Sequence, residues 1–249
     1  VQIYDITEKR AVEQMKSQFV ATVSHELRTP LTSIKGALGL LGGPMKGQMP
    51  NGADRLLEIA ASNADRLTSL VNDILDLEKI SSGEIQFQIE PHCVGDLLRS
   101  GIEHILPYAA QHKVRFETRL PDGPVFADVD YQRTEQLIAN LLSNACKYSD
   151  DDSIVHVHLE AVDGRALVCV LNTGPPIPNE FKSRIFQPFS QADGSDTRAK
   201  GGTGLGLNIS RQIAERMDGQ IGFESEEGAR TAFWFTVPLS KETTAKSNE

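Results

Sequence analysis

The spacing of the apolar residues changes at one point in the chain, Ser81-Ser82-Gly83. Before this point they recur in steps of three and four, over residues 8–41 and again over about residues 53–80. That spacing predicts two amphipathic helices. After it, "EIQFQIE" at 84–90 alternates apolar and polar residues, which predicts a strand. The chain therefore divides into a helical first part and a second part that contains a sheet.

The two long helices are separated by a stretch rich in Gly and Pro, "GLLGGPMKGQMPNG" at 39–52. Such a stretch breaks a helix and predicts an antiparallel hairpin. A single hairpin cannot cover the apolar stripes of both helices. We therefore expect a homodimer in which two hairpins form a four-helix bundle.

The second part alternates predicted strands with predicted helices. Helices are expected at about 94–112, 131–148 and 205–217, and strands at 114–120 and 125–127, in a hairpin over 153–172 that turns at Asp163-Gly164, and in a final hairpin over 219–239. This order predicts an α+β domain in which helices cover a mixed sheet.

Composition excludes several classes of protein. The 249 residues are 39% hydrophobic, which allows buried cores, and the net charge of −9 argues against a general nucleic-acid binder. The sequence contains no run of eighteen apolar residues, so it predicts no membrane-spanning helix. The three cysteines fit no metal spacing and indicate a reducing compartment, so we expect a cytoplasmic location; the full-length protein could still be membrane-anchored. The opening residues look like the middle of a longer chain.

The first stretch that carries chemistry is "SHELRTPL" at 24–31, inside the first helix. Thr29 lies four residues after His25, on the same helix face, and Glu26 follows the histidine directly. A neutral imidazole is a nucleophile, and a neighbouring carboxylate can orient it and accept its proton. Pro30 removes a helix hydrogen bond and predicts a bend. A lone helix histidine is usually only solvated, but this combination indicates a reactive one.

The second stretch is "LIANLLSNACKYSD" at 137–150. Asn140 and Asn144 are one helical turn apart, and Lys147 follows on nearly the same face. Amide oxygens suit a hard cation such as Mg²⁺, and a lysine suits a polyphosphate. The alternative is an amphipathic helix with its polar side outward.

The third stretch is "AKGGTGLGLNIS" at 199–210, just before a predicted helix. Closely spaced glycines let backbone N–H groups point into one concavity, and the positive end of the following helix adds to the attraction for phosphate. It matches neither the P-loop nor the dinucleotide pattern, and a flexible linker is the alternative.

A fourth feature is the end of the strand "ALVCVLN", where Asn172 precedes Thr173, Gly174 and three prolines within four residues. A strand that ends in a Gly/Pro turn often delivers a polar side chain to a pocket. We therefore treat Asn172 as a candidate binding residue.

In this order and spacing, "SHELRTPL", "NLLSNACKYS", "IFQPFSQAD" and "GGTGLGL" resemble the motifs of the sensor histidine kinases of two-component systems. The resemblance implies an α+β multidomain fold: a helical hairpin that forms a dimeric four-helix bundle, followed by an α/β-sandwich ATP-binding domain of the GHKL type. It implies that residues 1–15 are a signalling helix that leads out of an upstream sensor domain of PAS type. Residues 16–82 would form the dimerisation and histidine phosphotransfer domain, and residues 83–240 the catalytic ATP-binding domain. Residues 241–249 would be a disordered tail.

The resemblance also implies a function and its residues. His25 would accept the γ-phosphate of ATP in an Mg²⁺-dependent autophosphorylation, with Glu26 assisting and Thr29 serving dephosphorylation of the partner. The phosphoryl group would pass to an aspartate of a response-regulator receiver domain, and a hinge is expected at 80–83. Metal binding is assigned to Asn144 and Asn140. Cofactor binding is assigned to Asn140, Asn144, Lys147, Tyr148, Asn172, Gly174, Ile177, Phe189, Arg198, Gly202, Thr203, Gly204, Leu205 and Gly206.

Two positions depart from the family pattern. The family has an aspartate where this chain has Asn172, and a glycine where it has Pro176. A neutral amide still accepts a hydrogen bond from the adenine amino group, but without assistance from a charge, which costs about 1 kcal/mol. The alternative function is therefore a nucleotide-impaired regulatory or phosphatase-biased homologue. A gyrase-like or chaperone-like ATPase is a third interpretation, which "SHELRTPL" disfavours.

Overall fold

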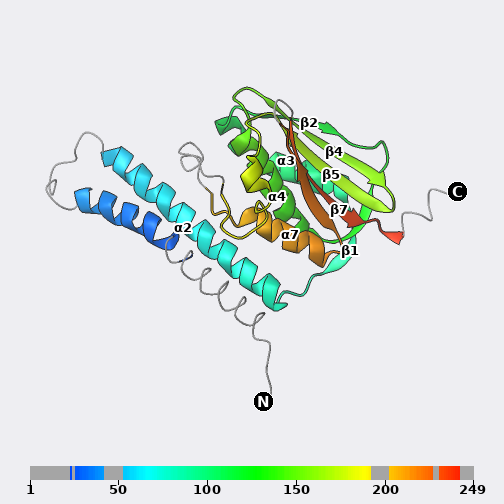
Figure 1. The fold of residues 1–249 in the computed structure, drawn as a ribbon, viewed down its shortest axis with the longest axis horizontal. Helices are drawn as coiled ribbons and strands as arrows, with labels where there is room; N and C mark the ends of the chain where they lie inside the picture. Colours follow the sequence, from blue (N-terminus) through cyan, green and yellow to red (C-terminus); the bar gives the residue numbers. More distant parts are fainter. Residues whose placement is uncertain (1–22, 24–25, 42–52, 192–201, 227–229, 242–249) are drawn as a thin grey trace, which may run out of the picture. The chain divides into compact units, whose positions relative to one another are not determined.

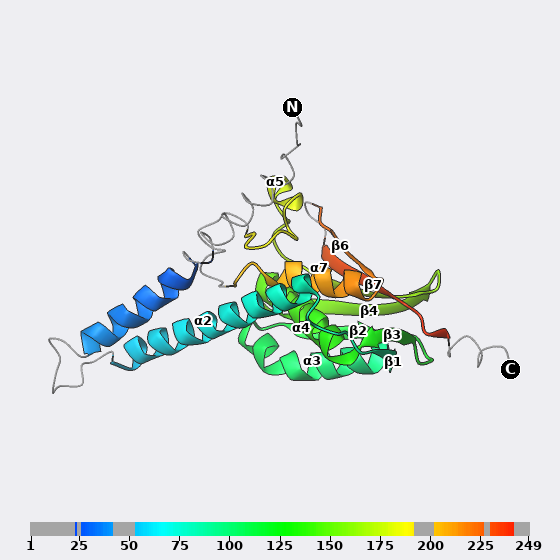
Figure 2. The same ribbon diagram turned by 90° about the horizontal axis from the view of Figure 1, so that it is seen from below.

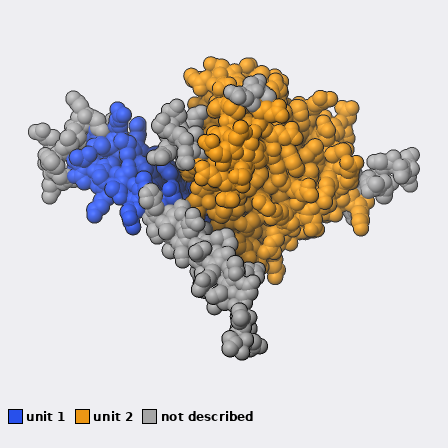
Figure 3. Space-filling view, viewed as in Figure 1, with its two compact units in different colours: residues 1–75, 201–205 blue, residues 76–200, 206–249 orange. Residues whose placement is uncertain are grey.

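The structure is a computed structural model that describes residues 23, 26–41, 53–191, 202–226 and 230–241 of the chain. It divides into two compact units, shown in Figure 3: residues 1–75 with 201–205, and residues 76–200 with 206–249. Each unit is described by itself below.

The described part of the first unit consists of two helices and the short segment 202–205. Residues 26–41 form one helix, and α2 (Ala53–Ser82) forms the second and continues into the other unit. Ala37, Ala60 and Leu70 are buried, while many larger apolar side chains of the two helices remain exposed. The second predicted helix is confirmed, as is the first within its described residues. The rest of the first helix and the loop at 42–52 lie outside the described residues.

The second unit is built around a five-stranded sheet in the order β2-β4-β5-β7-β6. Its strands are β2 (Arg115–Arg119), β4 (Ile154–Val162), β5 (Arg165–Asn172), β7 (Thr231–Pro238) and β6 (Gln220–Glu224). The β2–β4 pair is parallel and the other pairs are antiparallel, so the prediction of a mixed sheet is confirmed.

Three helices cover one face of this sheet, as Figures 1 and 2 show: α3 (Val94–Gln111), α4 (Tyr131–Tyr148) and α7 (Gly206–Arg216). Alternate residues of the strands point into this layer. Val157, Val170 and Phe235 are buried there, as are Leu141 of α4 and Ile213 of α7. The helix layer therefore fixes α4 and α7 against the sheet and against each other.

The hairpin turn predicted at Asp163-Gly164 joins β4 to β5. Both residues have positive φ, 49° and 74°, as a two-residue turn of this kind requires. The predicted bounds of the helix at 131–148 agree with α4 at both ends. Asp130 caps that helix, because its Oδ1 accepts from the backbone N–H of Arg133 at 2.9 Å.

The strand predicted at 84–90 is wrong for residues 84–88, which are not extended into a ladder. β1 (Ile89–Cys93) starts later and pairs with β3 (Phe126–Asp130) in a separate two-stranded sheet. The backbone N–H groups upstream are used elsewhere: Ile85 donates to Lys79 O and Gln88 donates to Asp130 Oδ2. Residues 84–88 are therefore a connector that hydrogen bonds hold to α2 and to Asp130, and not a strand.

The short helix α5 (Asn179–Lys182) follows β5 and completes the described elements. Among the described residues, every helix is too short or too polar to cross a lipid bilayer.

Candidate functional site

The polar face of α4 is the centre of the candidate site. Asn140, Asn144, Lys147 and Tyr148 are all half-buried on it, while the opposite face of the helix packs into the core. The core side is apolar because Leu141 and Leu142 lie between the asparagines in sequence and point inward. The helix thus presents its amides and its lysine on one side.

Asn140 is held by the first turn of α7. Its Nδ2 donates to the backbone O of Gly206 at 3.2 Å and to Ser210 Oγ at 3.3 Å. A Cβ added to Gly206 would lie 3.4 Å from Asn140 Oδ1, so glycine gives this amide its room. Because the donor side of the amide is used, Oδ1 is the atom that remains for a ligand.

Asn144 differs, because its side chain makes no hydrogen bond to any part of the chain that the structure describes. It is half-buried on the same face, one turn beyond Asn140. Mg²⁺ binds through one or two protein oxygens plus phosphate oxygens and waters. The described residues contain no group of three His, Cys, Asp or Glu side chains that could hold a metal. Two amide oxygens one helical turn apart fit a magnesium ion whose remaining ligands are phosphate oxygens and waters.

Lys147 and Tyr148 end the polar face. The Lys147 ammonium lies 4.9 Å from the centroid of the Tyr148 ring. Burial, with a smaller contribution from Tyr108, raises the pKa of the Tyr148 hydroxyl above its ordinary value, so the phenol stays neutral. A cation stacked on a neutral ring is a suitable neighbour for a polyphosphate and a flat base.

Asn172 ends β5 beside the last residue of α4. Its side chain is only 4% exposed, and its Nδ2 donates to the backbone O of Tyr148 at 3.3 Å. Gly174 lies even closer, since a Cβ there would sit 2.0 Å from that same oxygen. Gly174 is therefore required for close approach. It lets the end of β5 lie against α4, where the Nδ2 group of Asn172 can donate its hydrogen bond to Tyr148 O.

The turn after Gly174 is fixed by Ser225. The backbone N–H of Ile177 donates to Ser225 Oγ at 3.0 Å, and that hydroxyl also contacts Thr231 Oγ1 at 2.9 Å. Pro176 is exposed and has no N–H to satisfy. Pro178 then precedes α5 and accepts from Phe181 through its backbone O. The prolines thus form a rigid turn held by neighbouring strands.

Phe189 follows α5 with a positive φ of 58°, which is unusual for an aromatic residue. The nearby Phe186 contacts Phe223 at 6.0 Å between ring centroids, and its backbone O accepts from Asn208 Nδ2 at 2.8 Å. This segment is therefore tied to α7 and β6 at the point where the chain enters the glycine-rich stretch.

The described part of the glycine-rich stretch has the backbone that phosphate cradles use. Gly202 and Gly204 have positive φ, 137° and 71°. Thr203 Oγ1 accepts from the backbone N–H of Leu205 at 3.2 Å and donates to Asp73 Oδ2 at 2.6 Å. Residues 202–205 belong to the first unit, whereas Gly206 begins α7 in the second.

The acceptor stretch is described from Glu26 onward. Glu26 Oε2 pairs with Arg66 Nη2 of α2 at 3.5 Å, and the two side chains are 25% and 35% exposed. Thr29 is exposed, and Pro30 is buried within the helix. His25 and Arg198, both predicted as site residues, lie outside the described residues.

Sequence reasoning missed three residues of the site: Arg66, Ser210 and Ser225. Each acts on a predicted residue across a long stretch of chain, and neither Arg66 nor Ser225 lies in a motif that the sequence singles out. Only Ser210, four residues into α7 on the face of Gly206, carried a signal, because helix periodicity places the two together.

Two family models match the chain. The model described as "Histidine kinase-, DNA gyrase B-, and HSP90-like ATPase" matches residues 129–241, and the one described as "His Kinase A (phospho-acceptor) domain" matches residues 15–83.

The chain is also similar to curated sensor proteins of bacteria. It is 34% identical over 244 residues to sensor histidine kinase WalK of Bacillus subtilis, which matches 96% of the chain. It is 37% identical over 227 residues to sensor histidine kinase RcsC of Escherichia coli, which matches 91% of it. The chain spans only 39% of the length of WalK and 24% of that of RcsC.

Solved structures show the same architecture. ShkA, determined at full length in complex with AMPPNP, matches with a TM-score of 0.66 and 29% identity, over 90% of this chain and 46% of that one. ThkA, in complex with response regulator protein TrrA, matches with a TM-score of 0.75 and 24% identity, over 96% of this chain and 66% of that one.

Proposed function

The chain belongs to the sensor histidine kinases, and we propose that it uses ATP to phosphorylate its own His25 and passes the phosphoryl group to an aspartate of a response regulator. The observation that carries this proposal is the polar face of α4, where Asn140 and Asn144 present amide oxygens beside Lys147. Packing of the fold does not require such a polar face beside the start of α7.

The phosphate end of the nucleotide is assigned to this face and to the glycine-rich loop. Asn144, Asn140 and the phosphates would hold Mg²⁺, which neutralises negative charge on the triphosphate when bound. Lys147, Arg198 and the backbone amides at Gly202, Thr203, Gly204, Leu205 and Gly206 would supply the remaining positive potential.

The base end is assigned to Asn172, Gly174, Ile177, Tyr148 and Phe189. Because Asn172 Nδ2 already donates to Tyr148 O, its Oδ1 is the acceptor left for a ligand. An acceptor at this point matches the amino group of adenine and opposes the carbonyl of guanine. This orientation supports an active site rather than a nucleotide-impaired one.

The acceptor chemistry is assigned to the first helix. The neutral imidazole of His25 attacks the γ-phosphorus, the bond between that phosphorus and the bridging oxygen of ADP breaks, and the second ring N–H gives its proton toward Glu26. The ion pair with Arg66 orients the Glu26 carboxylate. Thr29, exposed one turn from His25, is assigned to the reverse step, in which a water removes the phosphoryl group from the regulator.

The partners follow from the same assignment. Exposed apolar residues of the two helices, including Leu38, Leu57 and Leu75, support a second copy of the chain that completes a four-helix bundle. A receiver domain would dock on that bundle, and a sensor domain of PAS type would precede it. Because ATP and receiver domains are cytoplasmic, we propose a cytoplasmic location for this part of the protein. Residues 16–82 and 83–240 are proposed as the two domains.

Incubation with γ-labelled ATP and Mg²⁺ tests this proposal. The parent protein, His25→Ala and Asn172→Asp are compared, and each is checked for ATP binding by calorimetry. Label that is stable to alkali and labile to acid, and absent from His25→Ala, is the expected result. No label in the parent beside strong label in Asn172→Asp would instead establish the nucleotide-impaired alternative.

A further inference from the structure

The last two turns of α2, residues 76–82, are packed into the ATP-binding unit, and we call them the docked end. The division into units falls between Leu75 and Asp76, in the middle of a continuous helix. Within the docked end, Leu77 and Ile80 are 7% and 1% exposed, so its apolar side is buried. A segment expected to act as a hinge would not be buried in this way.

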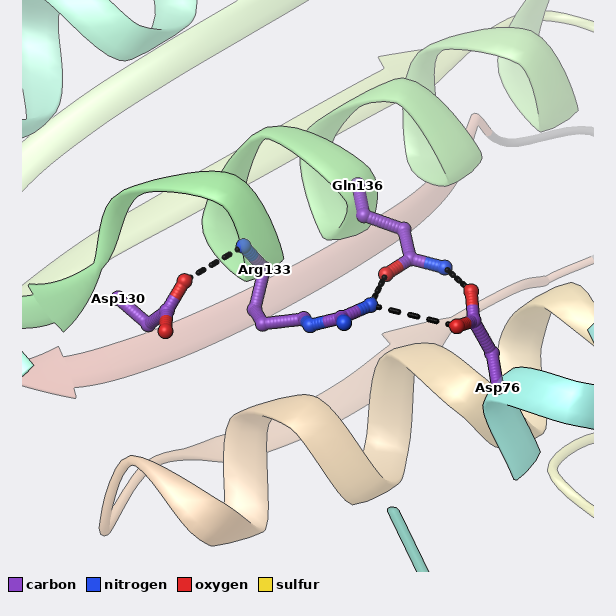
Figure 4. A network of polar contacts seen from close by, with 4 residues as sticks. All are labelled: Asp76, Asp130, Arg133 and Gln136. Atoms are coloured by element: carbon purple, nitrogen blue, oxygen red, sulfur yellow. Dashed lines mark hydrogen bonds and ion pairs between the residues drawn. The ribbon is translucent and has the colours of Figure 1, made fainter. Parts of the chain in front are cut away.

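A polar cluster fastens the first residue of the docked end to α4 (Figure 4). Asp76 Oδ2 accepts from Gln136 Nε2 at 2.8 Å, and Asp76 Oδ1 lies 3.5 Å from Arg133 Nη1. Arg133 Nη1 also donates to Gln136 Oε1 at 2.9 Å, so the three side chains form a closed set. All three are partly buried, which makes the cluster less sensitive to salt than an exposed pair.

Two further contacts fasten the last residues of the docked end to α7. Arg216 Nη2 donates to the backbone O of Ile80 at 2.6 Å, which satisfies a carbonyl at the helix C-terminus. Ser81 Oγ donates to Gln212 Oε1 at 3.1 Å. The connector that follows is held as well, through Gln88 N–H and Asp130 Oδ2 at 2.8 Å.

The residues just upstream have different partners. Asp73, one turn before Asp76, accepts from Thr203 and belongs to the first unit. Asn72 and Leu75 are exposed. The partners of α2 therefore change within one helical turn.

We infer that the pivot between the phospho-acceptor helices and the ATP-binding unit is the turn of α2 at 72–75, not the Ile80–Gly83 segment, and that Asp76, Arg133 and Gln136 make the docked end move as one body with α4. The inference rests on the proposed function, because it places the movement that phosphoryl transfer requires. A bend of α2 is then transmitted directly to the helix that carries Asn140 and Asn144, since the docked end and α4 share one cluster.

A cross-link across the docked end tests where the pivot lies. Ser81→Cys and Gln212→Cys are combined after Cys93, Cys146 and Cys169 have been changed to Ala, and the pair is joined with dibromobimane. If the pivot is upstream, the linked protein phosphorylates His25 within about twofold of the unlinked protein, because no movement occurs across the link. Loss of phosphorylation in the linked protein, with ATP binding retained, would overturn the inference and restore a hinge at 80–83.

Hydrogen exchange tests the inference even if the protein has no kinase activity. Absence of activity would contradict the proposed function but would not contradict the position of the pivot. Amides of residues 77–82 should exchange as slowly as those of α4, and more slowly than those of 72–75. Asp76→Ala should speed exchange at 77–82 by about tenfold, whereas Glu78→Ala, at an exposed carboxylate two residues away, should leave it unchanged. Exchange at 77–82 that is faster than at 72–75 in the parent would contradict the inference.

Discussion

The two ends of the proposed nucleotide site are built in different ways. At the proposed phosphate end, the side chain of Asn144 is half-buried and makes no hydrogen bond within the described residues, so it is available to a ligand. At the base end, Asn172 is buried and bonded to Tyr148 O, and Gly174 packs against the same oxygen. One end is thus poised for binding and the other is part of the fold.

This difference predicts that substitutions at the two ends will affect different properties, activity at one end and stability at the other. At the phosphate end, substitution of Asn144 should remove activity and leave stability almost unchanged, because its side chain makes no hydrogen bond within the described residues that could be lost. Changes at the base end should act on stability first and on affinity second, because the strand end and α4 depend on each other there.

The largest effect is expected from Asn144→Ala. Loss of the metal-facing amide should lower the rate of His25 phosphorylation by about 100-fold or more, since a preorganised electrostatic contact to the reacting groups is removed. The free energy of unfolding should change by less than about 0.5 kcal/mol. Ser143→Ala is the matched control, because this neighbouring hydroxyl donates only to Asn140 O within its own helix. Equal losses of phosphorylation rate in the Asn144→Ala and Ser143→Ala variants would contradict this difference between the two ends of the site.

Gly174→Ala should be the most destabilising single change at the base end. The new Cβ would lie 2.0 Å from Tyr148 O, so β5 and α4 must move apart. We expect the free energy of unfolding to fall by about 2–4 kcal/mol, measured by urea denaturation. Gly123→Ala, where a Cβ meets nothing within 4 Å, is the control and should change little. A Gly174→Ala protein of parental stability would show that the two elements do not depend on this contact.

Asn172→Asp should separate affinity from stability. The carboxylate cannot donate to Tyr148 O, so the nucleotide-free protein should lose about 1 kcal/mol of unfolding free energy. A charged acceptor should nevertheless strengthen ATP binding about fivefold to tenfold, and calorimetry with ATP and GTP measures this. Weaker ATP binding in the variant would show that the orientation of the amide, rather than its charge, sets affinity.

The smallest effect concerns Cys146, on the buried face of α4. Burial raises the pKa of its thiol from 9.0 to about 11. The folded state therefore favours the neutral thiol, and the resulting stability is complete below pH 9 and is lost as the pH rises toward about 11. Cys146→Ala should remove part of this alkaline loss when unfolding is followed from pH 8 upward. Parallel stability curves for the two proteins would contradict the assignment.

Much of the fold was readable from the sequence, because local patterns determine it. The bounds of α4 follow from its capping residue Asp130 and its apolar stripe, and the β4–β5 turn follows from Asp163-Gly164. The error at residues 84–88 arose because the connector is held by contacts such as Gln88 to Asp130, which no local pattern reveals.

The sequence proposes the residues of the candidate site but does not predict their geometry. The motifs identified Asn140, Asn144 and Asn172 by residue type and spacing. They could not show that Asn140 is bonded to Gly206 and Ser210, or that Asn172 donates to Tyr148 O, because these partners are distant in sequence. Only the packed structure determines which amide groups are hydrogen-bonded within the protein and which remain for a ligand.

Mapping of the phosphorylated residue tests the central claim most directly. The parent protein is incubated with ATP and Mg²⁺, or with GTP and Mg²⁺, and digested under alkaline conditions before mass spectrometry. We expect one phosphoryl group on the peptide that contains His25 after incubation with ATP, and none after incubation with GTP or in Asn144→Ala. A parent protein that binds ATP but leaves His25 unmodified, or that carries the phosphoryl group on another residue, would contradict the account.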